Sequence, residues 1–235
     1  MAYTDTTRKV TGSSAAAVSL DIVLNNTVAG NLVVVVCVAN RAGGPASAPT
    51  ITDGGNTWTK ETSQWVDPTG VGISWSVLTT GGNRTINCSP NGVNTYAIAA
   101  FAHEFSGQHA TPKSGTNVLS SGSSTTADTT AMTPADNDPL VVAAAGSVDG
   151  DTTFTENVGP GDTGWTLSNE QQTGASGATG SMVFKIISGA PGTPRAAWTL
   201  SPTRAWVTFI MAFKPSIDAA PAPIPATPLV GNLRW

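Results

Sequence analysis

Residues 30–36 read GNLVVVV and residues 138–144 read DPLVVAA, so that Leu32 and Leu140 lie 108 positions apart. Four further blocks recur in the same order at nearly the same spacing. They are residues 56–59 with 163–166, 73–78 with 182–187, 86–90 with 198–202, and 95–105 with 203–213. A recurrence of this kind indicates that each copy is one structural unit. We therefore predict two internal repeats of about 108 residues.

Each copy has the residue pattern of β-strands. Apolar and polar residues largely alternate in residues 18–24 and again in residues 73–77, which is typical of strands with one buried face. Residues 32–38 are apolar throughout and rich in valine, which favours a central strand covered on both faces, although a buried helix has the same periodicity. Turn-forming residues separate these runs, among them many of the 25 Gly and 16 Pro. The pattern predicts an all-β fold, either a β-sandwich or a jelly-roll-like sandwich.

The repeat also defines the domain organisation that we expect. The first β repeat covers residues 1–107, a polar connector 108–124, the second β repeat 125–215 and an extended Pro/Ala-rich arm 216–235. One copy is large enough to fold alone, so two separate domains are one arrangement. We favour one sandwich in which the copies pack their sheets face to face, because the connector is not a long flexible linker and the length suits one large core.

The chain is poor in charged residues. Only 11% of its 235 residues are charged, against roughly 25% in ordinary globular domains, while 40% are hydrophobic. Such a surface is common where neighbouring subunits cover much of the exterior. The net charge is −4 without a basic run, so we expect no nucleic-acid partner. No apolar run approaches the roughly 18 residues of a membrane helix, and residues 1–9 lack signal-peptide features, so we expect no membrane insertion and synthesis in the cytoplasm.

Groups that could support catalysis are few. His103 and Glu104 are adjacent on a predicted strand, so their side chains point to opposite faces and cannot act together. The Gly-x-Ser-x-Gly turn of many serine hydrolases does not occur. Asp149, Asp151 and Glu156 supply oxygen atoms that could bind Ca²⁺, but Asp-Gly is also ordinary turn chemistry. We predict no enzymatic activity, no catalytic residue, no cofactor and no metal site.

Two cysteines occupy predicted strands. Cys37 and Cys88 align with Ala145 and Leu200 of the other copy, which indicates buried hydrophobic positions instead of reactive thiols. Whether the two cysteines form a disulfide stays open at this level.

Aromatic residues recur between the copies. Three repeat-related pairs of large residues are expected in the core, namely Trp58 with Trp165, Trp75 with Phe184, and Ile86 with Trp198. Trp65 has no apolar role in this pattern and precedes a turn at residues 67–70. We therefore single out Trp65 as the candidate contact for a glycan.

The strand pattern ends near Pro215. Residues 219–228 are rich in Ala and Pro and are predicted to be extended. This segment and the residues after it contain apolar side chains without a local core, namely Ile224, Leu229, Val230, Leu233 and Trp235. A frayed terminus is one interpretation. We predict instead an arm that binds neighbouring subunits through these five residues.

Three motifs carry a resemblance to known proteins. AGNLVVVV at residues 29–36, GNTW at 55–58 and AIAAFAHEFSG at 97–107 resemble a recurrent type of phage and prophage virion protein, over roughly residues 15–214. The resemblance implies a β-sandwich on a tailed-phage particle, in the capsid or in the tail. It implies no catalytic residue, because the shared motifs are structural.

Two functions follow as expectations. The first is a non-enzymatic structural component of the virion, a capsid decoration or head-associated protein that contacts neighbouring subunits through its C-terminal arm. The alternative is a minor tail protein with a receptor- or glycan-binding module, which would contact a host surface glycan near Trp65. In both cases we expect a homo-oligomer that also binds other virion proteins, the major capsid protein or a tail protein.

Overall fold

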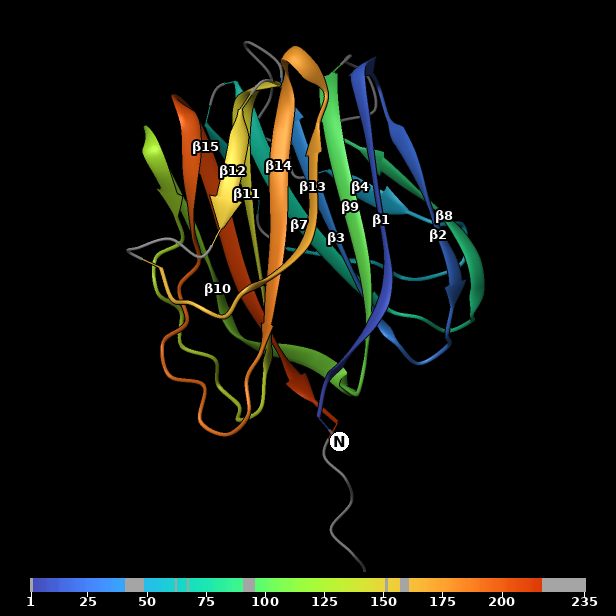
Figure 1. The fold of residues 1–235 in the computed structure, drawn as a ribbon. Helices are drawn as coiled ribbons and strands as arrows, with labels where there is room; N and C mark the ends of the chain where they lie inside the picture. The colour runs from blue at the N-terminus through green and yellow to red at the C-terminus, as the bar shows by residue number, and fades with distance from the viewer. Residues whose placement is uncertain are drawn as a thin grey trace, which may run out of the picture.

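The computed structural model describes residues 2–40, 49–61, 63–66, 68–90, 96–150, 152–156 and 161–216. Over these residues the chain forms fifteen strands and no helix, which confirms the predicted all-β class (Figure 1). No element in the described ranges is therefore a helix that could span a membrane.

The strands form two large sheets and one small sheet. In chain order they are β1 (Thr4–Ala17), β2 (Leu20–Thr27), β3 (Leu32–Asn40), β4 (Thr50–Thr52), β5 (Thr59–Lys60), β6 (Gln64–Val66), β7 (Thr69–Val77), β8 (Gly82–Ser89), β9 (Tyr96–Ser106), β10 (Gln108–Asp128), β11 (Leu140–Gly150), β12 (Thr153–Glu156), β13 (Thr166–Gln172), β14 (Gly174–Ile186) and β15 (Ala197–Pro215). The first large sheet has the order β1-β9-β3-β7-β5, with β6 also paired to β7. The second has the order β10-β15-β11-β14-β13, with β12 also paired to β15, and the small sheet is β2-β8-β4.

The two large sheets resemble each other. Each has a central strand, β3 or β11, between two long antiparallel neighbours. Leu32 lies opposite Phe105 in the first sheet, and Leu140 lies opposite Phe213 in the second. The sheets are thus similar in strand order and in register, whereas the origin of both from one duplicated unit stays a prediction from the sequence.

The two large sheets pack face to face and form the main core, as expected for a β-sandwich. One face of each central strand points into this core, with Val34 and Val36 from β3 and Val142 from β11. Four fully buried phenylalanines fill much of the space between the sheets, namely Phe101, Phe105, Phe209 and Phe213. Complete burial of each such ring stabilises the fold by about 1.5–3 kcal/mol.

The outer face of each large sheet is covered as well. Val33, Val35 and Cys37 of β3 pack against the small sheet, including Ile22 and Ile86. Both faces of β3 are therefore buried, which confirms the interpretation of residues 32–38 as a central strand. The second large sheet has a corresponding outer cluster that includes Phe154, Trp165, Trp198 and Leu200.

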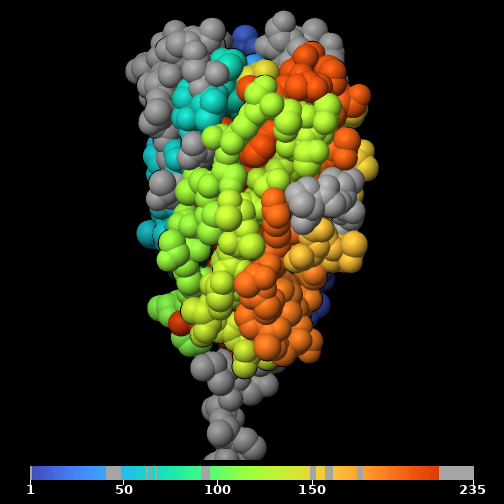
Figure 2. Space-filling view, turned by 90° about the vertical axis from the view of Figure 1, so that its left-hand side faces the viewer, coloured from blue at the N-terminus to red at the C-terminus, as the bar shows by residue number. Residues whose placement is uncertain are grey.

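The edge strand β10 corrects one sequence prediction. Residues 108–124, predicted to be a connector, form most of β10, which pairs with β15 along its length. Few side chains of β10 are buried, so its polar sequence lacks the apolar alternation that reveals a strand. Figure 2 shows β10 and the segment that follows it running along one side of the molecule.

The repeat-related tryptophans are mostly in the core, as predicted. Trp165 is buried and Trp198 is completely buried, and the Trp198 Nε1–H donates to Ser181 Oγ at 3.1 Å. Trp75 and Trp58 are half-buried and pack against the edges of the main core and of the small-sheet core, respectively.

Candidate functional site

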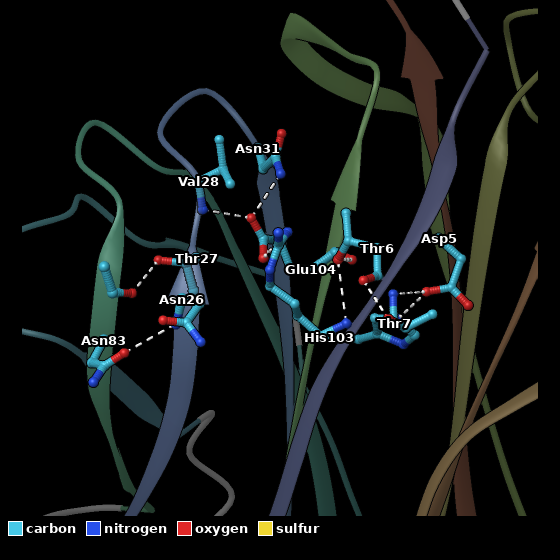
Figure 3. Close-up of polar contacts among 12 residues, drawn as sticks. Asp5, Thr6, Thr7, Asn26, Thr27, Val28, Asn31, Asn83, His103 and Glu104 are labelled. Carbon is cyan, nitrogen blue, oxygen red and sulfur yellow. Dashed lines mark hydrogen bonds and ion pairs between the residues drawn. The ribbon is translucent and has the colours of Figure 1, made fainter.

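Two adjacent ionisable residues of β9, His103 and Glu104, are completely buried. Their side chains leave β9 on opposite faces, as the sequence predicted, because successive strand residues alternate (Figure 3). Charged side chains are almost never fully buried unless they are paired. This pair, together with the β1 residues beside it, is therefore the candidate functional site.

Glu104 holds the turn between β2 and β3. Its Oε1 accepts hydrogen bonds from the Val28 backbone N–H at 2.8 Å and from Asn31 Nδ2–H at 2.7 Å. Its Oε2 forms an ion pair with Arg8 of β1, with 3.2 Å between Arg8 NH1 and the carboxylate oxygen. Three donors thus compensate for the removal of this carboxylate from water.

His103 connects β1 to the second large sheet. Its Nε2 lies 2.8 Å from Asp5 Oδ1, and its Nδ1 lies 2.7 Å from Ser168 Oγ on β13. The ring also stacks on Phe105, with 4.3 Å between the ring centroids. Burial lowers the pKa of His103 below its ordinary value, although the hydrogen bond and charge of Asp5 act in the opposite direction. Neutral His103 thus donates from Nε2 to Asp5 and accepts from the Ser168 hydroxyl.

A bulge in β1 makes these contacts fit. Asp5 lies opposite Phe105 and Lys9 lies opposite His103, so three residues of β1 face the single residue Glu104. Thr6 and Arg8 both reach Glu104 as a result, with Thr6 Oγ1–H donating to the Glu104 carbonyl at 2.7 Å. The residue between them, Thr7, adopts a φ of 60°, which is rare for a β-branched residue. Such a conformation costs on the order of 1–3 kcal/mol and persists only where its surroundings impose it.

The polar contacts of this site hold strands together. Asp5, His103 and Ser168 have the carboxylate–imidazole–hydroxyl connectivity of an acyl-transfer triad. However, His103 is 0% exposed and Ser168 only 2% exposed, so a substrate carbonyl cannot approach the hydroxyl in this conformation. What the arrangement does is join β1, β9 and β13, and therefore the two large sheets, through buried hydrogen bonds.

A second polar cluster closes the opposite edge of the sandwich. The buried Glu61 accepts a hydrogen bond from Trp75 Nε1–H at 2.8 Å and pairs with Lys113 of β10. Asn117 Nδ2–H adds a longer contact of 3.4 Å to the same carboxylate. This cluster ties the edge of the first large sheet to β10.

Trp65 has a defined position in the structure. It is half-buried, packs against the small-sheet core, and meets Tyr96 edge-to-face with 6.2 Å between ring centroids. Its ring lies directly over Gly70, where a Cβ atom would fall 2.1 Å from Trp65 Cε3. The ring thus has an apolar packing role that the sequence pattern did not reveal. Trp65, Gly70 and Pro49 line a small, mainly apolar pocket, and glycan contact at Trp65 stays a prediction.

The remaining predicted residues divide into two groups. Cys37 and Cys88 are both buried and free, as hydrophobic positions would be. Burial raises the pKa of Cys37 to about 12 and that of Cys88 well above its ordinary value. All five arm residues, Ile224, Leu229, Val230, Leu233 and Trp235, lie outside the described residues.

The structure describes only part of the segment that contains the possible Ca²⁺ ligands Asp149, Asp151 and Glu156. The side chains of Asp149 and Asp151 lie outside the described part of the chain. Within that part, no three His, Cys, Asp or Glu side chains gather as a metal ion would require.

Sequence reasoning predicted the opposite directions of His103 and Glu104 but neither their burial nor their partners. Asp5 is 98 residues from His103, and Ser168 is 65 residues from it. No local pattern connects such distant polar residues. One signal for the burial of this pair was present in the sequence. The aligned second copy has the apolar residues Met211 and Ala212 where the first has His103 and Glu104.

Searches against protein families, curated proteins and solved structures find no match for this chain.

Proposed function

We propose that this protein is a non-enzymatic structural component of a tailed-phage virion, a capsid decoration or head-associated protein. The non-enzymatic part of the proposal rests on the burial and hydrogen bonding of His103 and Glu104 on β9. His103 and Glu104 are completely buried, and their hydrogen-bonding groups are engaged by partners from β1, β13 and the β2–β3 turn. Ionisable groups that serve chemistry must reach a substrate, whereas these hold strands together.

The placement on a virion draws on composition and on motifs. A β-sandwich with few charged residues suits a subunit whose surface is largely covered by neighbours. The motifs at residues 29–36, 55–58 and 97–107 support a phage particle as the setting. In this proposal the arm at residues 216–235 binds the neighbouring subunits, and this part depends on the sequence alone.

A minor tail protein with a glycan-binding module is the second candidate, and Trp65 is the observation that favours it. Its ring lines a small apolar pocket, and its buried Nε1–H has no hydrogen-bond partner among the described residues. A buried tryptophan N–H usually has a hydrogen-bond partner. In this second candidate, a glycan acceptor supplies that partner once the ring has turned towards the pocket.

Antibody labelling of purified phage particles, followed by electron microscopy, tests both candidates. Label at many symmetric positions on the head is the expected result. Label confined to the tail would replace the first candidate with the second, and unlabelled particles would refute both.

Removal of residues 217–235 tests the arm. We expect the shortened protein to keep its melting temperature and to be lost from particles. The matched control is the full chain produced in the same way. Normal incorporation of the shortened protein would contradict a binding role for the arm.

A further inference from the structure

The small sheet ends in an open edge at β2. β2 pairs with β8 on one side, from Leu20 opposite Cys88 to Leu24 opposite Arg84, and it is the terminal strand in the order β2-β8-β4. Among the described residues no strand pairs with its other side. A free strand edge exposes unpaired backbone donors and acceptors, which another strand can satisfy.

β2 is the least protected edge among the strands described. Edge strands are usually guarded by Lys, Pro, bulges or shortness. β1 carries Arg8, Lys9 and a bulge, whereas β10 carries Pro112 and Lys113 and contains register shifts. β4 and β5 are only three and two residues long.

β6 and β12, which each pair with one strand, are also short, with three and four residues. The long edge strand β13 is joined to β1. Asn169 Nδ2–H donates to the Val10 carbonyl at 3.4 Å, and Gln171 Nε2–H donates to Ser13 Oγ at 3.0 Å. β2 also has a register shift, but it falls after Leu24, where Asn26 has a φ of 56°. Residues 20–24 pair with β8 without interruption and contain no Lys, Arg or Pro. The single charged residue of β2, Asp21, accepts a hydrogen bond from Asn87 at 2.7 Å.

Exposed valines gather along this same edge. Five large hydrophobic residues are exposed in the described part of the chain, and three of them, Val18, Val23 and Val28, lie on β2 or directly beside its ends. Val23 is 45% exposed although it sits in the middle of the strand, between the buried Ile22 and Leu24. Isolated exposed apolar residues are ordinary, but a line of three along an open edge marks an interaction surface.

The spacing of the three valines fits a second copy of the same strand. In an antiparallel pair centred on Val23, Val23 of one copy lies opposite Val23 of the second copy. The register then places Val18 of one copy at the same end of the seam as Val28 of the other, because both are five positions from Val23. Asp21 lies opposite the neutral Asn25, so like charges do not meet. This self-complementarity is what a two-fold interface requires.

We propose that β2 is a homodimerisation edge, at which two small sheets join through antiparallel β2–β2 pairing centred on Val23. Backbone hydrogen bonds supply the affinity and the valines fix the register. The seam is short, with five residues, 21–25, facing each other in each copy. Association is therefore expected to be weak and concentration-dependent in solution and to become strong where copies are held close together. The dimer does not depend on the proposed virion role.

Analytical ultracentrifugation of the full chain, from micromolar to millimolar concentration, tests the interface. We expect a monomer–dimer equilibrium for the natural sequence and monomers alone for Val23→Lys, because the two lysines would face each other at the centre of the seam. Ile186→Lys is the matched control, since it adds the same charge at an exposed apolar residue on β14, and it should still dimerise. A natural chain that stays monomeric throughout, or a Val23→Lys chain that dimerises normally, overturns the proposal.

Cysteine cross-linking tests the register separately. Val23→Cys should form a disulfide-linked dimer under mild oxidation, because directly opposed residues of antiparallel strands have Cβ atoms roughly 4.5–5.5 Å apart. Asn25→Cys, which lies opposite Asp21 in this register, should cross-link far more slowly. The natural Cys37 and Cys88 are buried and should not interfere. Equal rates for the two variants would reject the register centred on Val23.

Discussion

A single added methyl group at Gly180 tests whether the two large sheets meet as described. Gly180 lies on β14 and faces β3 and β9 across the main core. A Cβ atom there would fall 2.6 Å from Val38 Cγ2 and 3.0 Å from Phe101 Cε2. Ordinary carbon–carbon contacts are about 3.5–4.0 Å, so the sheets must absorb nearly 1 Å of overlap. Because packed cores resist such insertion, Gly180→Ala should lower the free energy of unfolding by about 1–3 kcal/mol.

Urea unfolding with an unchanged m-value is the appropriate measurement, and the melting temperature should fall by roughly 2–12 °C. Gly55→Ala is the matched control. Its Cβ would meet only the flexible end of Arg84, at 3.4 Å, so this substitution should be neutral or slightly stabilising. If Gly180→Ala proves as harmless as Gly55→Ala, the sheets do not approach each other at this point.

A compensating substitution sharpens the test. Val38→Ala alone removes two methyl groups from the core and should cost about 2 kcal/mol. In the double variant the alanine at position 180 occupies part of the space that Val38 leaves, so the combined loss should be smaller than the sum by about 0.5–3 kcal/mol. Strict additivity of the two losses would contradict direct contact between Val38 and Gly180.

Three further predictions concern buried side chains. His103→Met should flatten the pH dependence of stability below pH 6.5, which unfolding experiments at several pH values measure. Unfolded histidine binds a proton near that pH, whereas burial lowers the pKa of folded His103, so the stability of the natural chain falls as the pH decreases. Glu104→Ala should cost about 3–5 kcal/mol in denaturant titrations, whereas Glu104→Gln, which keeps an acceptor for the β2–β3 turn, should cost less. Calorimetry should show a loss of about 3–5 kcal/mol for Trp198→Ala and a smaller one for half-buried Trp58→Ala.

The strand pattern allowed most of the fold to be predicted. Residues 32–38 are apolar on both faces because one face of β3 packs in the main core and the other packs against the small sheet. A run of apolar residues without alternation therefore indicates the burial of both faces. The edge strand β10 escaped prediction for the opposite reason. An edge strand with a solvated face needs backbone hydrogen bonds more than apolar side chains, so Ser, Thr and Gly suffice in most of residues 114–126.

The candidate site was only half predictable. Alternation along a strand fixes the opposite directions of His103 and Glu104. Their partners depend on a bulge in β1, which places three residues opposite Glu104, and on the packing of β13 against β9. Both features arise from contacts between distant segments, and neither has a signature in a single sequence.

The polar contacts of His103 and Glu104 are better explained as fixing the position of β1 than as stabilising the sandwich. The corresponding strand of the second large sheet, β15, has Met211 and Ala212 at these positions, both buried, so this kind of sheet forms without a polar pair. β1 itself has no fully buried residue, and apolar packing therefore specifies its register weakly. Asp5 and Arg8 supply what packing does not, since a shift of β1 along β9 would remove one buried partner from His103 and one from Glu104. His103 and Glu104 thus fix the register of β1, which hydrophobic burial specifies only weakly.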